Sequence, residues 1–128
     1  MTVARQCLGR RAEELVAEAL VREGARIVAA NVRPSGVRGE IDLIAMEGST
    51  LVFVEVKARS ESATRGPDTP LLAVDRRKQF RLRRLAAAWL RELGDRAPRR
   101  RSVRFDVVGL TLDDSGHVVA WDHVRGAF

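Results

Sequence analysis

Two apolar runs separated by a short turn constrain the fold of this chain more than any other feature. Residues 51–58 are hydrophobic at both alternate sets of positions until charged side chains appear near the end of the run, which indicates a strand buried on both faces of a sheet. Residues 40–46 form the second run, and Gly48 and Ser49 between the runs suit a two-residue type II′ turn. The pattern therefore predicts an antiparallel hairpin with two buried faces.

Charged residues lie inside these apolar runs, where an ionised side chain needs a partner or a metal ion. Glu55 and Lys57 are two residues apart, so they face the same side of their strand. The register set by the turn places Asp42 opposite Glu55 and Glu40 opposite Lys57, and directly opposite Cβ atoms are about 4.5–5.5 Å apart. Two carboxylates that close repel each other unless a proton or a cation lies between them. The pattern therefore predicts a site for a hard cation such as Mg²⁺ beside an ammonium group.

A structural alternative for these charges is also open. Glu55 and Lys57 could form an ion pair on an edge strand, with Asp42 ending its own strand in solvent, and a slip of one residue would turn Asp42 to the other face. Glu13 lies at the margin of the apolar stripe of the first helix, so it is either another site carboxylate or an exposed helix residue. Glu40 is either a partner that tunes Lys57 or a surface acid at the start of its strand.

The rest of the chain has the patterns of helices and strands that complete an α/β fold. Apolar spacing and β-type composition predict helices at 9–23 and 74–93 and further strands at 26–30, 104–112 and 118–121. A long loop is predicted at 60–72. The order αβββαβ implies a mixed sheet with helices packed on it, in a single domain spanning residues 1–128. Trp89 and Trp121 are expected in the core, and His123 at the surface or at the edge of the core.

Length and composition exclude several classes of protein. With 45% hydrophobic and 31% charged residues the 128-residue chain is not a disordered tail, and no apolar run approaches the ~20 residues of a membrane span. The single cysteine, Cys7, excludes an intrachain disulfide and a cysteine-based zinc cluster. The N-terminus lacks the apolar core and cleavage site of a signal peptide. We therefore expect a cytoplasmic protein with no membrane partner.

An excess of basic residues points to an anionic partner. The formal net charge is +6, but 21 of the 23 basic residues are arginines, a skew that genomic base composition can produce. The arginines of the second helix therefore form either a nucleic-acid interface or a solvated face. Only Lys57 and Lys78 are lysines, which suggests that these positions need a compact ammonium group. Lys78 lies on the inward stripe of its helix, as a phosphate contact or as a core-edge side chain.

Two motifs in the hairpin carry a resemblance to a known family. Residues 39–45 (GEIDLIA) and 52–59 (VFVEVKAR) resemble the signature of the YraN-like bacterial proteins, a family predicted to belong to the PD-(D/E)XK nuclease superfamily beside the archaeal Holliday junction resolvases. The resemblance covers nearly the whole chain. It also takes in Ala12 and Glu13, Gly24, Asn31, Ala73 and Val74, Lys78, residues 104–108, His123, and Ala127 and Phe128.

The resemblance implies a restriction-endonuclease-like αβββαβ core. It implies that Asp42, Glu55 and Lys57 form the D…ExK triad and that Glu13 is the acid of the first helix. One position departs from the family pattern, because Ala12 precedes Glu13 where the family usually has glycine. Alanine is better tolerated than glycine inside a helix, so we expect little effect from the difference.

These assignments lead to a hypothesis of a metal-dependent endonuclease that acts on DNA, with branched DNA as a candidate substrate. Mg²⁺ or Mn²⁺ would be bound by Asp42, Glu55, the Val56 carbonyl and Glu13, and Lys57 would orient or help to deprotonate the attacking water. The candidate nucleic-acid contacts are Arg59, Arg77, Lys78, Arg81 and Arg84. A homodimer would suit a two-fold junction. RNA is an open alternative substrate, and a catalytically idle binding or scaffold module is the alternative function.

Overall fold

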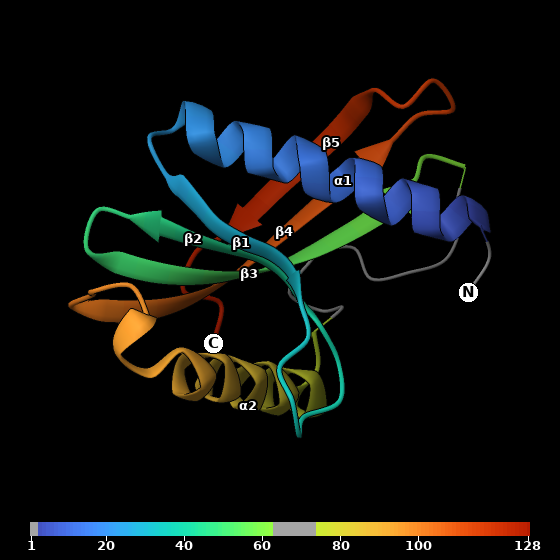
Figure 1. Cartoon of the computed structure of the whole chain (residues 1–128). Helices are drawn as coiled ribbons and strands as arrows, with labels where there is room; N and C mark the ends of the chain where they lie inside the picture. Colours follow the sequence, from blue (N-terminus) through green and yellow to red (C-terminus); the bar gives the residue numbers. More distant parts are fainter. Residues whose placement is uncertain (1–2, 63–73) are drawn as a thin grey trace.

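A five-stranded mixed sheet lies between two helices (Figure 1). The computed structural model of the chain describes residues 3–62 and 74–128. The elements in chain order are α1 (Val3–Arg22), β1 (Arg26–Val32), β2 (Ile41–Glu47), β3 (Thr50–Ser60), α2 (Arg76–Leu93), a 3₁₀ turn η2 (Gly94–Arg96), β4 (Ser102–Leu112) and β5 (Val118–Val124). In the described part of the chain, neither helix is long and apolar enough to cross a membrane.

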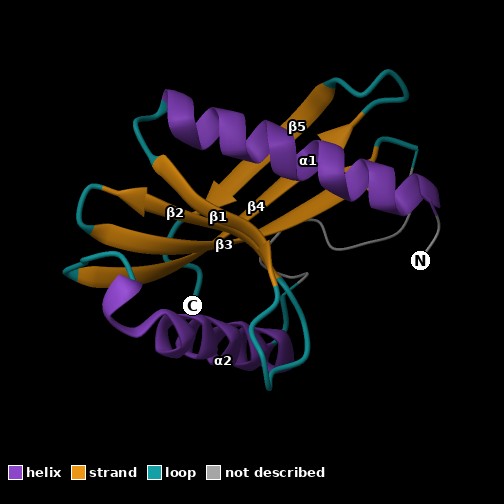
Figure 2. Ribbon diagram, in the orientation of Figure 1, coloured by secondary structure: helices purple, strands orange, loops and turns teal. Residues whose placement is uncertain are grey.

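The strands lie in the order β1-β2-β3-β4-β5 (Figure 2). β3 and β4 are parallel, and the other three neighbouring pairs are antiparallel. α2 lies in the crossover between the two parallel strands, as parallel pairing requires a long connection. This arrangement confirms the predicted mixed α/β fold with helices flanking the sheet, and it is compatible with an αβββαβ nuclease core.

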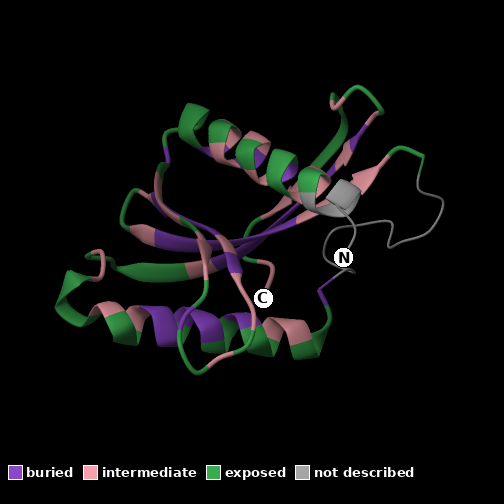
Figure 3. Cartoon of the chain, turned by 45° about the vertical axis from the view of Figure 1, so that its right-hand side comes forward, coloured by how far each residue is buried: buried purple, intermediate pink, exposed green. Residues whose placement is uncertain are grey.

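Each helix covers one face of the sheet, so the central hairpin is buried on both sides, as its sequence predicts. On one face, Ala12, Val16 and Leu20 of α1 pack against strand residues that include Val54. On the other face, Leu82, Leu85, Ala86 and Trp89 of α2 pack in a second core cluster. The ring of Phe53 makes an edge-on contact with Trp89 and stacks on Phe105. Figure 3 shows buried residues along the middle strands and the inner side of both helices.

The hairpin has the predicted register over most of its length. The ladder runs from Glu47–Thr50 to Leu43–Val54, and Gly48 has a φ of 60°, as the first position of a type II′ turn requires. The ladder ends one position before the predicted pairing of Asp42 with Glu55.

The Asp42 carboxylate explains this end of the ladder. Its Oδ2 accepts the backbone N–H of Val56 at 2.9 Å, so a side chain takes the place of a main-chain partner. Ile41 and Ile44 belong to the same core cluster although they are three residues apart, so the regular alternation of β2 is broken between them. The prediction that Asp42 lies directly opposite Glu55 in a regular ladder is therefore wrong.

Other element boundaries also differ from the sequence prediction. α1 begins at Val3 and not at Gly9, because one glycine inside a helix costs only about 1 kcal/mol and good helix formers precede it. α2 begins at Arg76, after Asp75, whose side chain accepts the Lys78 N–H as an N-cap. β3 continues through Ser60, and residues 63–72 of the predicted loop lie outside the described residues.

A buried carboxylate ties the C-terminal segment to the sheet. Asp106 on β4 is 1% exposed, and it accepts hydrogen bonds from Arg104, from the His123 ring and from the Gly126 N–H. Burial would raise the pKa of Asp106, but these hydrogen bonds outweigh burial and lower it to about 2. Of the two predicted places for His123, the surface and the edge of the core, the structure shows the edge of the core. Trp121 is 39% exposed, so its predicted place in the core is wrong.

We predict that Asp106→Ala lowers the free energy of unfolding by about 3 kcal/mol or more, because it leaves Arg104 and His123 without their shared anion. Urea denaturation followed by circular dichroism measures the change. Asp122→Ala on the exposed part of β5 is the matched control and should change stability by less than about 0.5 kcal/mol. An Asp106→Ala protein as stable as the control would contradict the proposed anchoring role.

Candidate metal centre

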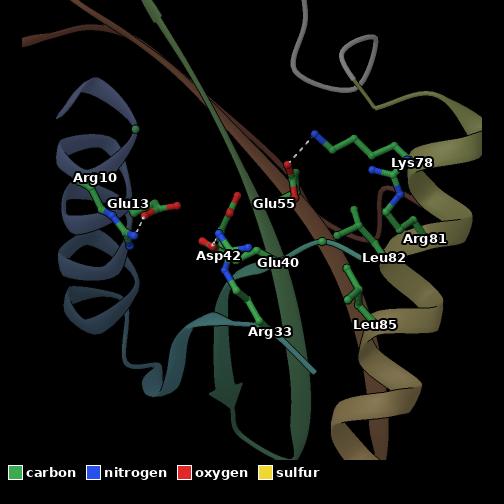
Figure 4. Close-up of a pocket in the computed structure, with 12 residues that line it drawn as sticks. Arg10, Glu13, Arg33, Glu40, Asp42, Glu55, Lys78, Arg81, Leu82 and Leu85 are labelled. Atoms are coloured by element: carbon green, nitrogen blue, oxygen red, sulfur yellow. Dashed lines mark ion pairs between the residues drawn. The ribbon is translucent and has the colours of Figure 1, made fainter. Parts of the chain in front are cut away.

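Three carboxylates from separate parts of the chain converge at one end of the hairpin. Glu13 comes from α1, Glu40 from the loop before β2, and Asp42 from β2, and one oxygen of each lies within 4.8 Å of the others. All three side chains are half-buried. They line an open pocket of about 480 Å³ between the two helices (Figure 4).

The fold explains how α1 delivers Glu13 to this pocket. Ala12 is fully buried against the sheet, so the next residue lies at the edge of the helix face that meets the strands. An exposed arginine, Arg10, reaches the Glu13 carboxylate at 3.7 Å. Glu14 pairs with Arg11 on the exposed side of the helix. Of the two alternatives for Glu13, the structure therefore supports a place in the site.

Asn31 connects two of the three acids. Its side-chain nitrogen donates to Glu13 at 2.9 Å and to Glu40 at 2.8 Å. Asn31 has a φ of 51°, and no other non-glycine residue in the described ranges has a positive φ. Asparagine adopts this left-handed conformation more readily than most residues. Residue patterns alone did not reveal this role, although Asn31 is among the positions of the family resemblance.

Glu40 has different partners from those predicted. Its carboxylate pairs with Arg33 at 2.9 Å, accepts from Asn31 and lies beside Glu13 and Asp42. The expectation that Glu40 lies opposite Lys57 and tunes it is therefore not met. The sequence signal for Glu40 as a site acid is its position two residues before Asp42.

The surroundings of the Asp42 carboxyl raise its pKa strongly. Burial raises its pKa first, the nearby Glu55 and Glu13 raise it further, and the Val56 N–H lowers it only in part, so that it rises to about 8. These surroundings favour the protonated form of Asp42, whereas the other two acids pair with Arg10 and Arg33. Such a site takes up either a proton or a cation.

Glu55 lies in the same pocket but in a different charge environment. It is 6% exposed, and its Oε1 lies 3.0 Å from the Lys78 ammonium and 3.3 Å from the Lys57 ammonium. Burial, together with the neighbouring Lys78 ammonium, lowers the pKa of Lys57 despite the attraction of Glu55. Burial would also lower the pKa of Lys78, but the interactions with Glu55, Lys57 and Asp42 together outweigh burial and raise it. The predicted acidic and basic parts of the site are thus adjacent, with Glu55 between them.

The donor set fits a hard divalent cation. Carboxylate oxygens are preferred ligands of Mg²⁺, and Glu13, Glu40 and Asp42 bring one oxygen each to the same small volume. Compared with the predicted ligands Asp42, Glu55, Glu13 and Val56, this group adds Glu40 and leaves Glu55 bound to the lysines. Val56 contributes its N–H to Asp42, and its carbonyl as a ligand stays a prediction.

Four of the five predicted nucleic-acid contacts lie on α2, and two of these four line the pocket. Lys78 and Arg81 line the pocket itself. A second hollow on the outer side of α2 is lined by Arg76, Arg77, Phe80, Arg81 and Arg84. Arg59 is half-buried on β3. Gly39 has a φ of 121°, and an added Cβ would lie 3.2 Å from Leu85 and 3.3 Å from Arg81, so glycine lets this loop approach α2 closely.

Comparison with known proteins identifies relatives along the full length of the chain. The family described as "Uncharacterised protein family UPF0102" matches residues 12–110. A UPF0102 protein of Moorella thermoacetica is 44% identical over 128 residues and covers 100% of both chains. UPF0102 proteins of an Arthrobacter species and of Rhodococcus opacus are each 45% identical, over 96% and 94% of this chain and 97% and 95% of their own.

We predict that Asp42→Asn stabilises the metal-free protein at alkaline pH. A carboxyl whose pKa is raised from 3.8 to about 8 on folding loses stabilising free energy as the pH rises between these values, whereas an amide does not ionise. The amide can still accept the Val56 N–H and donate to Glu13. Thermal unfolding in EDTA should show a higher midpoint for the variant at pH 8, with the difference shrinking toward pH 4. A variant less stable than wild type at pH 8 would contradict this electrostatic description.

Proposed function

The chain belongs to the UPF0102 family, the YraN-like family, and we propose that it is a metal-dependent endonuclease that hydrolyses phosphodiester bonds in DNA. One observation carries the proposal: a cluster of three carboxylates lines the same open pocket as the Lys78 ammonium, which Glu55 joins to the Lys57 ammonium. Both kinds of group suit the hydrolysis of a phosphodiester, because carboxylates can hold a cation that activates the attacking water and ammonium groups can hold the phosphate anion.

The carboxylates supply the cation site in this proposal. Glu13, Glu40 and Asp42 would hold Mg²⁺ or Mn²⁺, and cation binding would replace the proton that the raised pKa of Asp42 otherwise retains. When bound, the cation would supply an acidified water and positive charge near the phosphate. Asn31 and Val56 keep the acids in place through their N–H groups.

The lysines divide the remaining chemistry between them. Because the pKa of Lys57 is lowered, a larger fraction of its side chain is in the neutral amine form. This amine can orient the attacking water and accept a proton from it. The raised pKa of Lys78 keeps that ammonium charged, which suits a phosphate contact. Glu55 positions both nitrogens from a single oxygen.

The rim of the pocket favours a polyanionic substrate. Arg10, Arg33 and Arg81 line the pocket together with the acids, so a phosphate backbone can bring its negative charge to the site although the cluster itself is acidic. The net charge of +6 acts in the same direction over longer distances. Branched DNA is a candidate substrate, and a homodimer would present two such pockets to a two-fold junction.

We predict metal-dependent cleavage within a labelled panel of duplex, single-strand, flap and four-way-junction DNA and a structured RNA. Each substrate is incubated with Mg²⁺, Mn²⁺ or EDTA, and the products are resolved on a denaturing gel. Asp42→Asn should reduce the cleavage rate at least about 100-fold by removing a ligand charge, and it should do so without loss of folding.

Two matched variants of α1 test the assignment of the site. Glu13→Gln removes a carboxylate from the cluster and should reduce cleavage strongly, whereas Glu14→Gln removes the adjacent exposed carboxylate and should leave the rate within about twofold of wild type. Preferential cleavage of RNA would correct the substrate class. Nucleic-acid binding with no cleavage in either metal would favour the idle binding module and contradict the proposed enzyme.

A further inference from the structure

The outward face of α2 carries an exposed aromatic ring among arginines, and we propose that Phe80 stacks on an unpaired base of the nucleic acid held at the site. This inference rests on the proposed function for its substrate class, and it adds a structural preference: the bound nucleic acid has a single-stranded segment next to the cleavage site. Phe80 is 70% exposed, the largest exposed fraction among the large hydrophobic side chains of the described residues.

The position of Phe80 on the helix separates it from the core. The buried side chains Leu82, Leu85 and Trp89 define the inner face of α2. At 100° per residue, Phe80 falls on the side opposite these residues. Packing among residues 3–62 and 74–128 therefore does not account for a phenyl ring at this position.

Arginines surround the ring on the same face. Arg76 and Arg84 are four residues before and after Phe80, and Arg77 is three residues before it, so all three are its neighbours on the helix surface. Together with Arg81 they line a shallow hollow around the ring. A π-face within a cluster of guanidinium groups matches a nucleotide, whose base stacks while its phosphates pair with the arginines.

Arg81 connects this hollow with the candidate metal centre. It lines the pocket that contains Glu13, Asp42 and Glu55, and it also lines the hollow around Phe80. A strand with its phosphate at the carboxylate cluster can therefore continue over Arg81 onto the outer face of α2. A base pair inside a duplex is stacked on both faces, so along a continuous strand stacking on Phe80 requires an unpaired nucleotide.

The chemistry and the position of this face favour nucleic acid over a membrane or a second protein. An interfacial membrane helix presents an apolar face of several residues, whereas Phe80 is a single apolar side chain among four arginines. Aromatic and arginine side chains also occur at protein interfaces, so the preference for nucleic acid over a protein rests on the position of this face beside the candidate metal centre. The continuity through Arg81 is the additional argument for a phosphodiester strand.

A thermodynamic cycle measured without metal tests the stacking contact separately from cleavage. Wild type and Phe80→Ala are titrated in EDTA against a fluorescent duplex with a short single-stranded overhang, by anisotropy. The overhang carries either thymines or abasic residues, which keep the phosphates and remove the bases. DNA and RNA overhangs are compared in parallel, and Val21→Ala, at an exposed apolar position on α1, is the control.

We expect Phe80→Ala to weaken binding of the thymine overhang by about fivefold or more, and to change binding of the abasic overhang little. Wild type should lose a similar factor when the bases are removed. Phe80→Trp should restore binding, and Arg84→Ala should weaken both overhangs to a similar degree because it removes only charge. Since Phe80 is exposed, the variants should retain the thermal midpoint of wild type.

Equal loss of affinity for thymine and abasic overhangs, or no loss for either, would overturn the stacking site. Self-association or binding to anionic vesicles that requires Phe80, with DNA binding unchanged, would overturn it in favour of a protein or membrane contact. If Phe80→Ala weakens binding of the thymine overhang alone in a protein that cuts no substrate, the result would support the base site and contradict the endonuclease. Cleavage by a protein in which Phe80→Ala affects thymine and abasic overhangs equally would support the endonuclease and contradict the base site.

Discussion

The hydrogen bond from the Val56 N–H to the Asp42 carboxylate determines the shape of the candidate site. It ends the β2–β3 ladder at Leu43–Val54 and turns Asp42 out of the regular alternation of its strand. In a continuous antiparallel ladder, backbone groups would satisfy one another and the carboxylate would have no such partner. Because the hairpin behind this point is buried on both faces, the carboxylate is presented from a rigid support.

The site depends on keeping two groups of charges adjacent but separate. Asn31 bridges Glu13 and Glu40 on the acidic side, and Glu55 holds Lys57 and Lys78 on the basic side. Asp42 is a third acid beside these groups, and burial together with the nearby Glu55 and Glu13 raises its pKa. Functional sites commonly retain such unfavourable charges because the chemistry requires them. The unrelated Asp106 cluster shows the opposite case, since its partners stabilise the ionised form.

Sequence reasoning predicted the features that follow from regular periodicity. It predicted the buried hairpin, its register up to Leu43–Val54 and the inner face of α2, because each repeats over many residues. It did not predict the roles of Asn31, Glu40 and Asp106. Contacts such as those of Asn31 with Glu13 and of Asp106 with His123 join separate segments, which periodicity does not relate. The face of Asp42 could not be predicted because a side chain, and not the backbone, pairs with Val56. Exposed Phe80 gave no signal in the apolar pattern, since it lies outside the helix stripe.

The location of Mn²⁺ in crystals of the protein is the most direct test of the central claim, that Glu13, Glu40 and Asp42 form a divalent cation site. Anomalous diffraction identifies the ion independently of any assay of activity. The account predicts an anomalous peak bounded by these three carboxylates, with Glu55 still paired with Lys57 and Lys78. A crystal saturated with Mn²⁺ that shows no peak there, or a peak at Glu55 with the lysines displaced and Glu40 uninvolved, would contradict it.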